Sequence, residues 1–174
     1  MLYVIRHGEV DTNIKNQVNG WNEKKLNNKG VIQAKEAMNN VEKLNIDVIF
    51  CSRLPRTKQT CYLINKNKIP VIYDERLKER NANSMTYASV KTLDNKIWYD
   101  KSKDIIYKDT EGFKNIIFRV FRFLEEIKKD YKDKNVLLVT HGDICKAIYL
   151  YFNPNTLDIS DYHQDNCEIV FYEL

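Results

Sequence analysis

The sequence of 174 residues predicts a three-layer α/β/α sandwich with a mostly parallel central sheet. Short apolar runs rich in Val and Ile, typical of buried strands, alternate with segments in which apolar residues recur at helical spacing. This alternation favours parallel strands joined by helices that cover both faces of the sheet. Because a chain of this length fits one hydrophobic core, we expect a single domain over residues 1–174.

The first strand is expected at Leu2–Ile5, a β-branched and aromatic run that ends abruptly at Arg6. A helix over about 28–44 should follow the next loop, because apolar residues share one helical face there. They are Val31, Ala34, Met38, Val41 and Leu44.

A second strand at 47–51 and a third at 71–73 flank another predicted helix. This helix should run from Pro55 to about Asn65, because Pro is tolerated in the first turn. The polar and aromatic stretch from about 74 to 110 has weak periodicity, so we expect an irregular segment there.

A strongly amphipathic helix is predicted over 113–127, with Asp109 or Thr110 as its cap. The continuous apolar run at 136–139 is typical of a strand that is buried on both faces. The remaining predicted elements are a helix over 144–152 and a closing strand over 168–173.

The charge is mild and evenly spread, since 28 basic and 24 acidic residues give a net charge of +4. Such a diffuse excess suits a small anionic substrate and argues against binding to nucleic acid or to a membrane surface. No apolar stretch approaches the roughly 18 residues of a membrane span, and the N-terminus lacks a signal-peptide core. We therefore expect a cytoplasmic protein with reduced cysteines.

Two of the three histidines occupy the same position, at the end of an apolar strand and directly before a glycine. His7 follows the first strand and His141 follows the strand at 136–139, whereas His163 lacks such a context. The carboxyl ends of parallel strands meet at one edge of the sheet, where ligands bind in folds of this class. We therefore expect His7 and His141 to lie close together at this edge.

The residues beside these two histidines suit a phosphate group. Gly8 and Gly142 let the backbone approach a ligand closely, and the helix after His141 can offer unpaired N–H groups to an anion. Arg6 adds a planar, permanently charged fork that matches phosphate oxygens. No cluster of His, Cys and carboxylates has metal-ligand spacing, so we expect no metal and no other cofactor.

A series of motifs extends this pattern along the chain. They are Arg6-His-Gly-Glu9 with Asn13, the loop and helix residues Gly20, Leu26, Gly30 and Gln33-Ala34, the segment Ser52–Thr60 with Arg56, the stretch Leu77–Glu79, and Val139–Gly142. In this order they resemble the histidine phosphatase superfamily, whose fold is phosphoglycerate-mutase-like. The sequence departs from that resemblance at Asn81–Ser84, where many members carry a glycine and a tryptophan-acid pair.

The resemblance implies a phosphohydrolase in which neutral His7 attacks phosphorus and forms a phosphohistidine. The groups that would hold the phosphoryl oxygens in place of a metal are Arg6, Arg56 and His141, with Asn13 and the Gly142 backbone as further donors. Glu79 is implied as the acid that protonates the leaving oxygen, and Glu9 is its competitor. Arg80 is expected to contact the non-reacting end of the substrate.

The segment at about 74–110 covers the active site in this family, so its aromatic residues have two interpretations. They form either an apolar rim for the substrate or the local core of the segment. The residues concerned are Met85, Tyr87, Trp98, Tyr99 and Tyr107.

We expect a metal-independent phosphomonoesterase of the histidine acid type that hydrolyses a small phosphorylated metabolite. A cofactor-dependent phosphoglycerate mutase is one alternative, but such mutases are generally longer, and this chain ends at Leu174 directly after its last strand. A catalytically silent module that binds phosphate or a phosphopeptide is the other alternative. Such a module would have no reason to keep the nucleophile His7.

Overall fold

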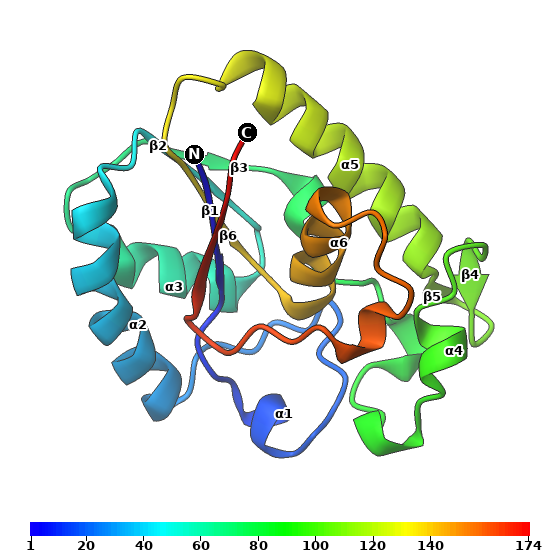
Figure 1. The fold of residues 1–174 in the computed structure, drawn as a ribbon. Helices are drawn as coiled ribbons and strands as arrows, with labels where there is room; N and C mark the ends of the chain where they lie inside the picture. The colour runs from blue at the N-terminus through cyan, green and yellow to red at the C-terminus, as the bar shows by residue number, and fades with distance from the viewer.

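The computed structural model describes all 174 residues and has the three-layer α/β/α architecture that the sequence predicts (Figure 1). Its central sheet has five strands in the order β3-β2-β6-β1-β7. The strands are β1 (Leu2–Arg6), β2 (Val48–Cys51), β3 (Val71–Tyr73), β6 (Val136–Thr140) and β7 (Ile169–Tyr172). The first four pair in parallel and β7 runs antiparallel to β1, which confirms a mostly parallel sheet.

Two pairs of helices cover the two faces of this sheet (Figure 1). They are α2 (Asn28–Val41) with α3 (Pro55–Ile64) on one face, and α5 (Phe113–Asp130) with α6 (Gly142–Phe152) on the other. Along β6, Leu137 and Val139 belong to the core under the first pair, whereas Leu138 belongs to the core under the second. A strand packed on both faces needs apolar residues at every position, which explains its unbroken apolar run.

The carboxyl ends of β1 and β6 lie side by side. Their register pairs Arg6 with Thr140, and the backbone N–H of His7 donates to the carbonyl of Thr140 at 3.0 Å. His7 and His141 therefore follow neighbouring strands at one edge of the sheet.

Residues 74–110 form short turns beside this edge (green in Figure 1). The elements within them are η2 (Glu75–Leu77), η3 (Asn83–Met85), η4 (Val90–Thr92), α4 (Asn95–Trp98) and β4 (Ile105–Ile106). A small hydrophobic core holds these turns together; it consists of Ala82, Trp98 and Ile106 from the segment and Val18 from outside it.

The structure shows that the predicted cap of α5 is wrong. Gly112, and neither Asp109 nor Thr110, is the N-cap residue. Thr110 lies instead in β5 (Thr110–Glu111), which pairs with β4, and its hydroxyl donates to the carbonyl of Ala82 at 3.0 Å. A hairpin with two-residue strands is too short to produce an apolar alternation, so the sequence pattern did not reveal it.

The other elements are short. They are α1 (Asp11–Ile14), η1 (Glu42–Leu44), which ends the helix predicted over 28–44, and η5 (Ile159–Asp161). No helix in the chain has the length and apolar character needed to cross a membrane.

Candidate active site

His7 is buried at the end of β1, with 1% of its surface exposed. Its Nδ1 lies 2.8 Å from the carbonyl oxygen of Gly8. Because a carbonyl oxygen can only accept, Nδ1 carries the proton and Nε2 keeps a lone pair. Burial, followed by the positive charges of Arg56 and Arg6, holds the pKa of His7 well below its ordinary value. At neutral pH, His7 is therefore an uncharged imidazole with a nucleophilic nitrogen.

His141 lies directly beside His7, with the ring centroids 5.2 Å apart in an edge-to-face arrangement. It is the residue before α6, and its Nε2 lies 2.7 Å from the hydroxyl of Ser52. Its Nδ1 is buried and has no hydrogen-bond partner. Burial is the main reason that the pKa of His141 lies well below its usual value. The expected approach of the two imidazoles is thus present.

Arg56 is completely buried in the first turn of α3, and its guanidinium reaches His7. Its Nε donates to Nε2 of His7 at 3.3 Å, and the rest of the fork donates to the carbonyls of Gly20 and Asn22 at 2.8 and 3.1 Å. Burial lowers the pKa of Arg56 to about 10, so the group remains charged at neutral pH. Gly20 has a φ of +53°, and a Cβ there would lie 2.8 Å from Cβ of Ala82, so only glycine fits.

Arg6, Gly142 and Glu79 lie close to one another at this edge of the sheet. A Cβ built on Gly142 would lie 3.8 Å from Cζ of Arg6 and 3.9 Å from Oε2 of Glu79. Arg6 is held by a hydrogen bond from Nη1 to the carbonyl of Gln164 at 2.8 Å, while its buried Nε has no partner. A permanent positive charge, a helix N-terminus and a carboxyl group therefore border the same space.

Glu79 has the properties required of a general acid near neutral pH. Burial raises its pKa to about 7, and the negative charge of Asp143 adds to that shift, while Arg56 and Arg6 oppose it. Its competitor Glu9 is engaged elsewhere, because its carboxylate accepts from Asn27 at 3.1 Å and pairs with Lys29 at 3.0 Å.

Arg80 is 1% exposed, and two of its three guanidinium nitrogens have hydrogen-bond partners, whereas its buried Nη2 has none. Its Nε donates to Oδ2 of Asp143 at 2.6 Å, its Nη1 donates to the carbonyl of Glu111 at 3.0 Å, and its guanidinium lies 4.2 Å from the ring centre of Trp98. Asp143 also accepts from Trp98 and from Tyr99, each at 3.3 Å. Arg80 borders the cavity, but much of its charge is already balanced by Asp143.

A cavity of about 230 Å³ borders the site. Five of the predicted residues line it, namely Arg6, Asn13, Glu79, Arg80 and Gly142. His7, Arg56 and His141 do not line it, and each of them is at most 1% exposed. Asn13 uses its side-chain oxygen to accept from the backbone N–H of Val10 at 3.0 Å, which leaves its NH₂ group free for a ligand.

The aromatic residues of segment 74–110 divide between the two interpretations. Trp98 and Tyr99 line the cavity, and Trp98 also belongs to the local core of the segment. Met85 and Tyr107 pack against that core and do not line the cavity, whereas Tyr87 is exposed.

Sequence reasoning missed three contacts at this site. Ser52 follows β2 at the same edge of the sheet, a position that could have revealed its contact with His141. Asp143 lies in the first turn of α6, where an acidic residue is common, so its position alone does not indicate a functional contact. Gln164 binds Arg6 through a backbone carbonyl, so its residue type carries no signal.

No group of three or more His, Cys, Asp or Glu side chains is placed to hold a metal ion.

Comparison with known proteins identifies related sequences along almost the whole chain. The model of one family, the histidine phosphatase superfamily (branch 1), matches residues 2–174. A metal-independent phosphoserine phosphatase from Arabidopsis thaliana is 31% identical over 159 residues, which cover 86% of this chain and 67% of that protein. A 2,3-bisphosphoglycerate-dependent phosphoglycerate mutase from Cytophaga hutchinsonii is 28% identical over 162 residues, which cover 87% of this chain and 76% of the mutase.

A solved structure shares the fold. Phosphoserine phosphatase from Entamoeba histolytica, in complex with 3-phosphoglyceric acid, superposes with a TM-score of 0.83 at 21% identity. The superposition covers 97% of this chain and 87% of the other.

Proposed function

This chain belongs to the histidine phosphatase superfamily, branch 1, and from that premise we propose that it is a phosphomonoesterase that works through a phosphohistidine on His7. One observation carries the proposal. The Nδ1–H of His7 is bound to the Gly8 carbonyl at 2.8 Å, so the lone pair of Nε2 is directed toward Arg56 and away from the backbone.

In the first half-reaction, Nε2 of His7 forms a bond to phosphorus while the bond from phosphorus to the leaving oxygen breaks. The guanidinium groups of Arg6 and Arg56 and the imidazole of His141 stabilise the phosphoryl oxygens. Protonated Glu79 gives its proton to the leaving oxygen, so an alcohol departs. The hydrogen bond from Arg56 to Nε2 passes to a phosphoryl oxygen as the substrate enters.

In the second half-reaction, the Glu79 carboxylate takes a proton from water, and the resulting hydroxide oxygen attacks phosphorus. The bond from phosphorus to Nε2 breaks, inorganic phosphate leaves, and His7 returns to its neutral form. In both half-reactions Arg6, Arg56 and His141 stabilise the negative charge on the phosphoryl oxygens, so the proposed reaction needs no metal. The name of the Arabidopsis relative describes that protein as metal-independent, which supports this part of the proposal.

Phosphoglycerate mutase is the second candidate, because the Cytophaga relative carries that name. A mutase would form the same phosphohistidine and would return the phosphoryl group to the substrate instead of to water. The two functions share every residue named above and differ only in the acceptor.

A product assay separates them. The purified protein is incubated with p-nitrophenyl phosphate, with a panel of phosphorylated metabolites and with 3-phosphoglycerate plus 2,3-bisphosphoglycerate. We expect release of inorganic phosphate from at least one panel member and its loss in His7→Ala. Isomerisation of phosphoglycerate without net phosphate release would instead establish the mutase, and tight phosphate binding without turnover would refute both.

A further inference from the structure

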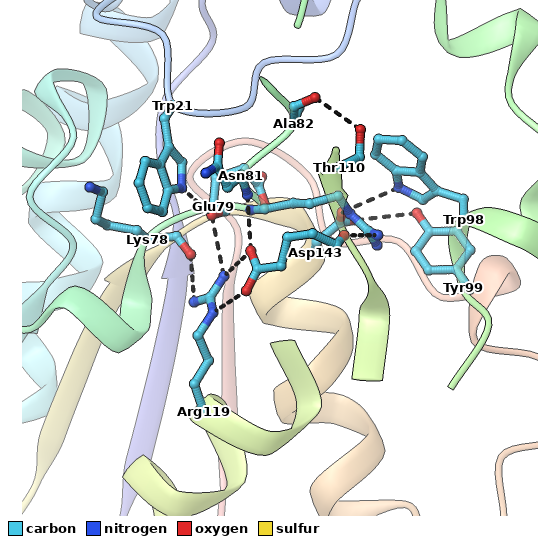
Figure 2. Close-up of polar contacts among 12 residues, drawn as sticks. Trp21, Lys78, Glu79, Asn81, Ala82, Trp98, Tyr99, Thr110, Arg119 and Asp143 are labelled. Atoms are coloured by element: carbon cyan, nitrogen blue, oxygen red, sulfur yellow. Dashed lines mark hydrogen bonds and ion pairs between the residues drawn. The ribbon is translucent and has the colours of Figure 1, made fainter. Parts of the chain in front are cut away.

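Arg119 lies on α5, outside the cavity, and reaches the segment that carries Glu79 (Figure 2). Its Nη1 donates to the carbonyls of Arg76 and Lys78 at 2.5 and 2.7 Å, and its Nη2 donates to the carbonyl of Glu79 at 3.2 Å. Residues 78–81 belong to no strand or helix, so they lack the backbone ladder that would otherwise fix their position. Arg119 supplies hydrogen bonds in place of that ladder.

Glu111 holds Arg119 in this orientation. The Nε of Arg119 donates to Oε1 of Glu111 at 2.9 Å, and its Nη2 donates to Oε2 at 3.1 Å. Both side chains are largely buried, with 18% and 16% exposed. The negative charge of Glu111 balances the positive charge of Arg119, so the pair acts on its surroundings mainly through geometry.

Glu111 also binds the chain on the far side of Glu79. Its Oε2 accepts from the backbone N–H of Asn81 at 2.9 Å, its own N–H donates to the carbonyl of Asn81 at 2.9 Å, and its carbonyl accepts from Arg80. The backbone is thus held before, at and after Glu79. A further donor, Nε1 of Trp21, reaches the carbonyl of Glu79 at 2.6 Å.

We propose that Arg119, fixed by Glu111, is the positioning residue for the acid Glu79 and sets where its carboxyl group meets the leaving oxygen. This inference rests on the proposed function. All five N–H groups of the Arg119 guanidinium have acceptors, which are three carbonyls and the two oxygens of Glu111. A lysine ammonium has three N–H groups and no planar fork, so it cannot replace this set.

The position of Glu79 affects one chemical step, the protonation of the leaving oxygen. A proton donor must lie within hydrogen-bond distance of the leaving oxygen, and a displacement of about 1 Å can lower a rate by about 10²-fold. Arg6, Arg56 and the two histidines are held by other elements. A disturbed Arg119 therefore impairs protonation of the leaving group while phosphoryl binding is kept.

The test compares Arg119→Lys with Arg122→Lys, a matched change at an exposed arginine on the same helix. Initial phosphorylation of the enzyme is measured with glycerol phosphate, whose alkoxide needs a proton, and with p-nitrophenyl phosphate, whose leaving group does not. We expect Arg119→Lys to lose about 10- to 100-fold on glycerol phosphate and much less on p-nitrophenyl phosphate. Arg122→Lys should behave like the unaltered protein on both substrates.

A double variant makes the test specific. If Arg119 acts through Glu79, then Arg119→Lys combined with Glu79→Gln should be no slower on glycerol phosphate than Glu79→Gln alone. Glu111→Gln keeps Arg119 but weakens the ion pair that orients it. This variant should show a smaller loss on glycerol phosphate than Arg119→Lys and again little loss on p-nitrophenyl phosphate. It provides a second test in case Arg119→Lys does not fold.

Equal losses on the two substrates, or losses that add to those of Glu79→Gln, would overturn the positioning role and leave the proposed function intact. If Glu79→Gln itself shows no contrast between the substrates, Glu79 is not the acid and this inference fails, while hydrolysis through His7 still stands. If the unaltered protein releases phosphate from no member of the metabolite panel, the proposed function fails and this inference fails with it.

Discussion

The Nε of Arg56 lies 3.3 Å from Nε2 of His7, so a buried cation donates to the nitrogen that we propose as the nucleophile. The other two nitrogens of the same guanidinium are fixed on the carbonyls of Gly20 and Asn22. In this arrangement the lone pair of His7 stays unprotonated and lies against Arg56, the group that we propose stabilises the transferred phosphoryl oxygens.

Replacing Arg56 with lysine should lower kcat/KM by about 10²- to 10³-fold, the usual effect of removing one donor to a transition-state oxygen. The loss should be similar for alkyl and aryl phosphates, because Arg56 acts on the phosphoryl group and not on the leaving group. Steady-state kinetics measure this effect. Arg53→Lys is the control, since Arg53 lies in the loop directly before α3 and its side chain is 55% exposed. Normal turnover in Arg56→Lys would rule out this role.

Replacing Glu79 with glutamine should have an effect that depends on the leaving group. Loss of the transferred proton should slow hydrolysis of an alkyl phosphate by about 10²- to 10⁴-fold, with a much smaller effect on p-nitrophenyl phosphate. Slow water activation could hide this contrast in steady state, so a burst of nitrophenol is measured first by stopped flow. Release of the alcohol in the first turnover is measured for the alkyl phosphate. Equal losses in this first chemical step on both substrates would show that another group is the acid.

The pH profile of kcat/KM should rise at low pH and fall near neutrality. The reaction needs neutral His7, whose pKa is well below its ordinary value, and protonated Glu79, whose pKa is about 7. Activity therefore increases as His7 loses its proton and decreases as Glu79 loses its own.

Asp143→Asn should move the descending limb of this profile to lower pH. Removing the negative charge of Asp143 makes the Glu79 carboxylate less unfavourable, and Arg80 is left without its ion-pair partner, so both changes lower the pKa of Glu79. The limb is followed with an alkyl phosphate from pH 5 to 9. A limb that stays in place or moves upward would disprove the coupling.

The edge of the sheet could be predicted from the sequence because its strands are buried on both faces. Continuous apolar runs identify β1 and β6, and parallel strands present their carboxyl ends together. The close approach of His7 and His141 follows from those two facts. Arg56 required the additional resemblance to a family, since a lone arginine in a helix carries no such signal.

The supporting contacts could not be predicted in the same way. Arg119 is a charged residue on an amphipathic helix and Glu111 is a charged residue just before it, and solvent exposure is the usual expectation for both. Their partners lie 30 to 43 positions away in the chain, and most are backbone atoms, so residue types do not reveal them. The ion pair between Arg80 and Asp143 spans 63 positions, so the sequence pattern did not reveal it either.

Activity should survive a strong chelator. No cluster of three or more His, Cys, Asp or Glu side chains is suited to a metal ion, and the proposed charge stabilisation comes from side chains alone. Phosphate release is compared before and after prolonged dialysis against EDTA. Loss of turnover that is restored by adding a divalent cation would contradict a metal-independent reaction.

Location of the phosphoryl group during turnover tests the account most directly. The protein is mixed with a rapidly hydrolysed substrate, quenched within one turnover under alkaline conditions that preserve phosphohistidine, and digested for mass spectrometry. We predict a phosphoryl group on His7, absent from His7→Ala and lost again as inorganic phosphate appears. Turnover with the phosphoryl group on another residue, or on none while unaltered His7 is recovered throughout, would contradict the account.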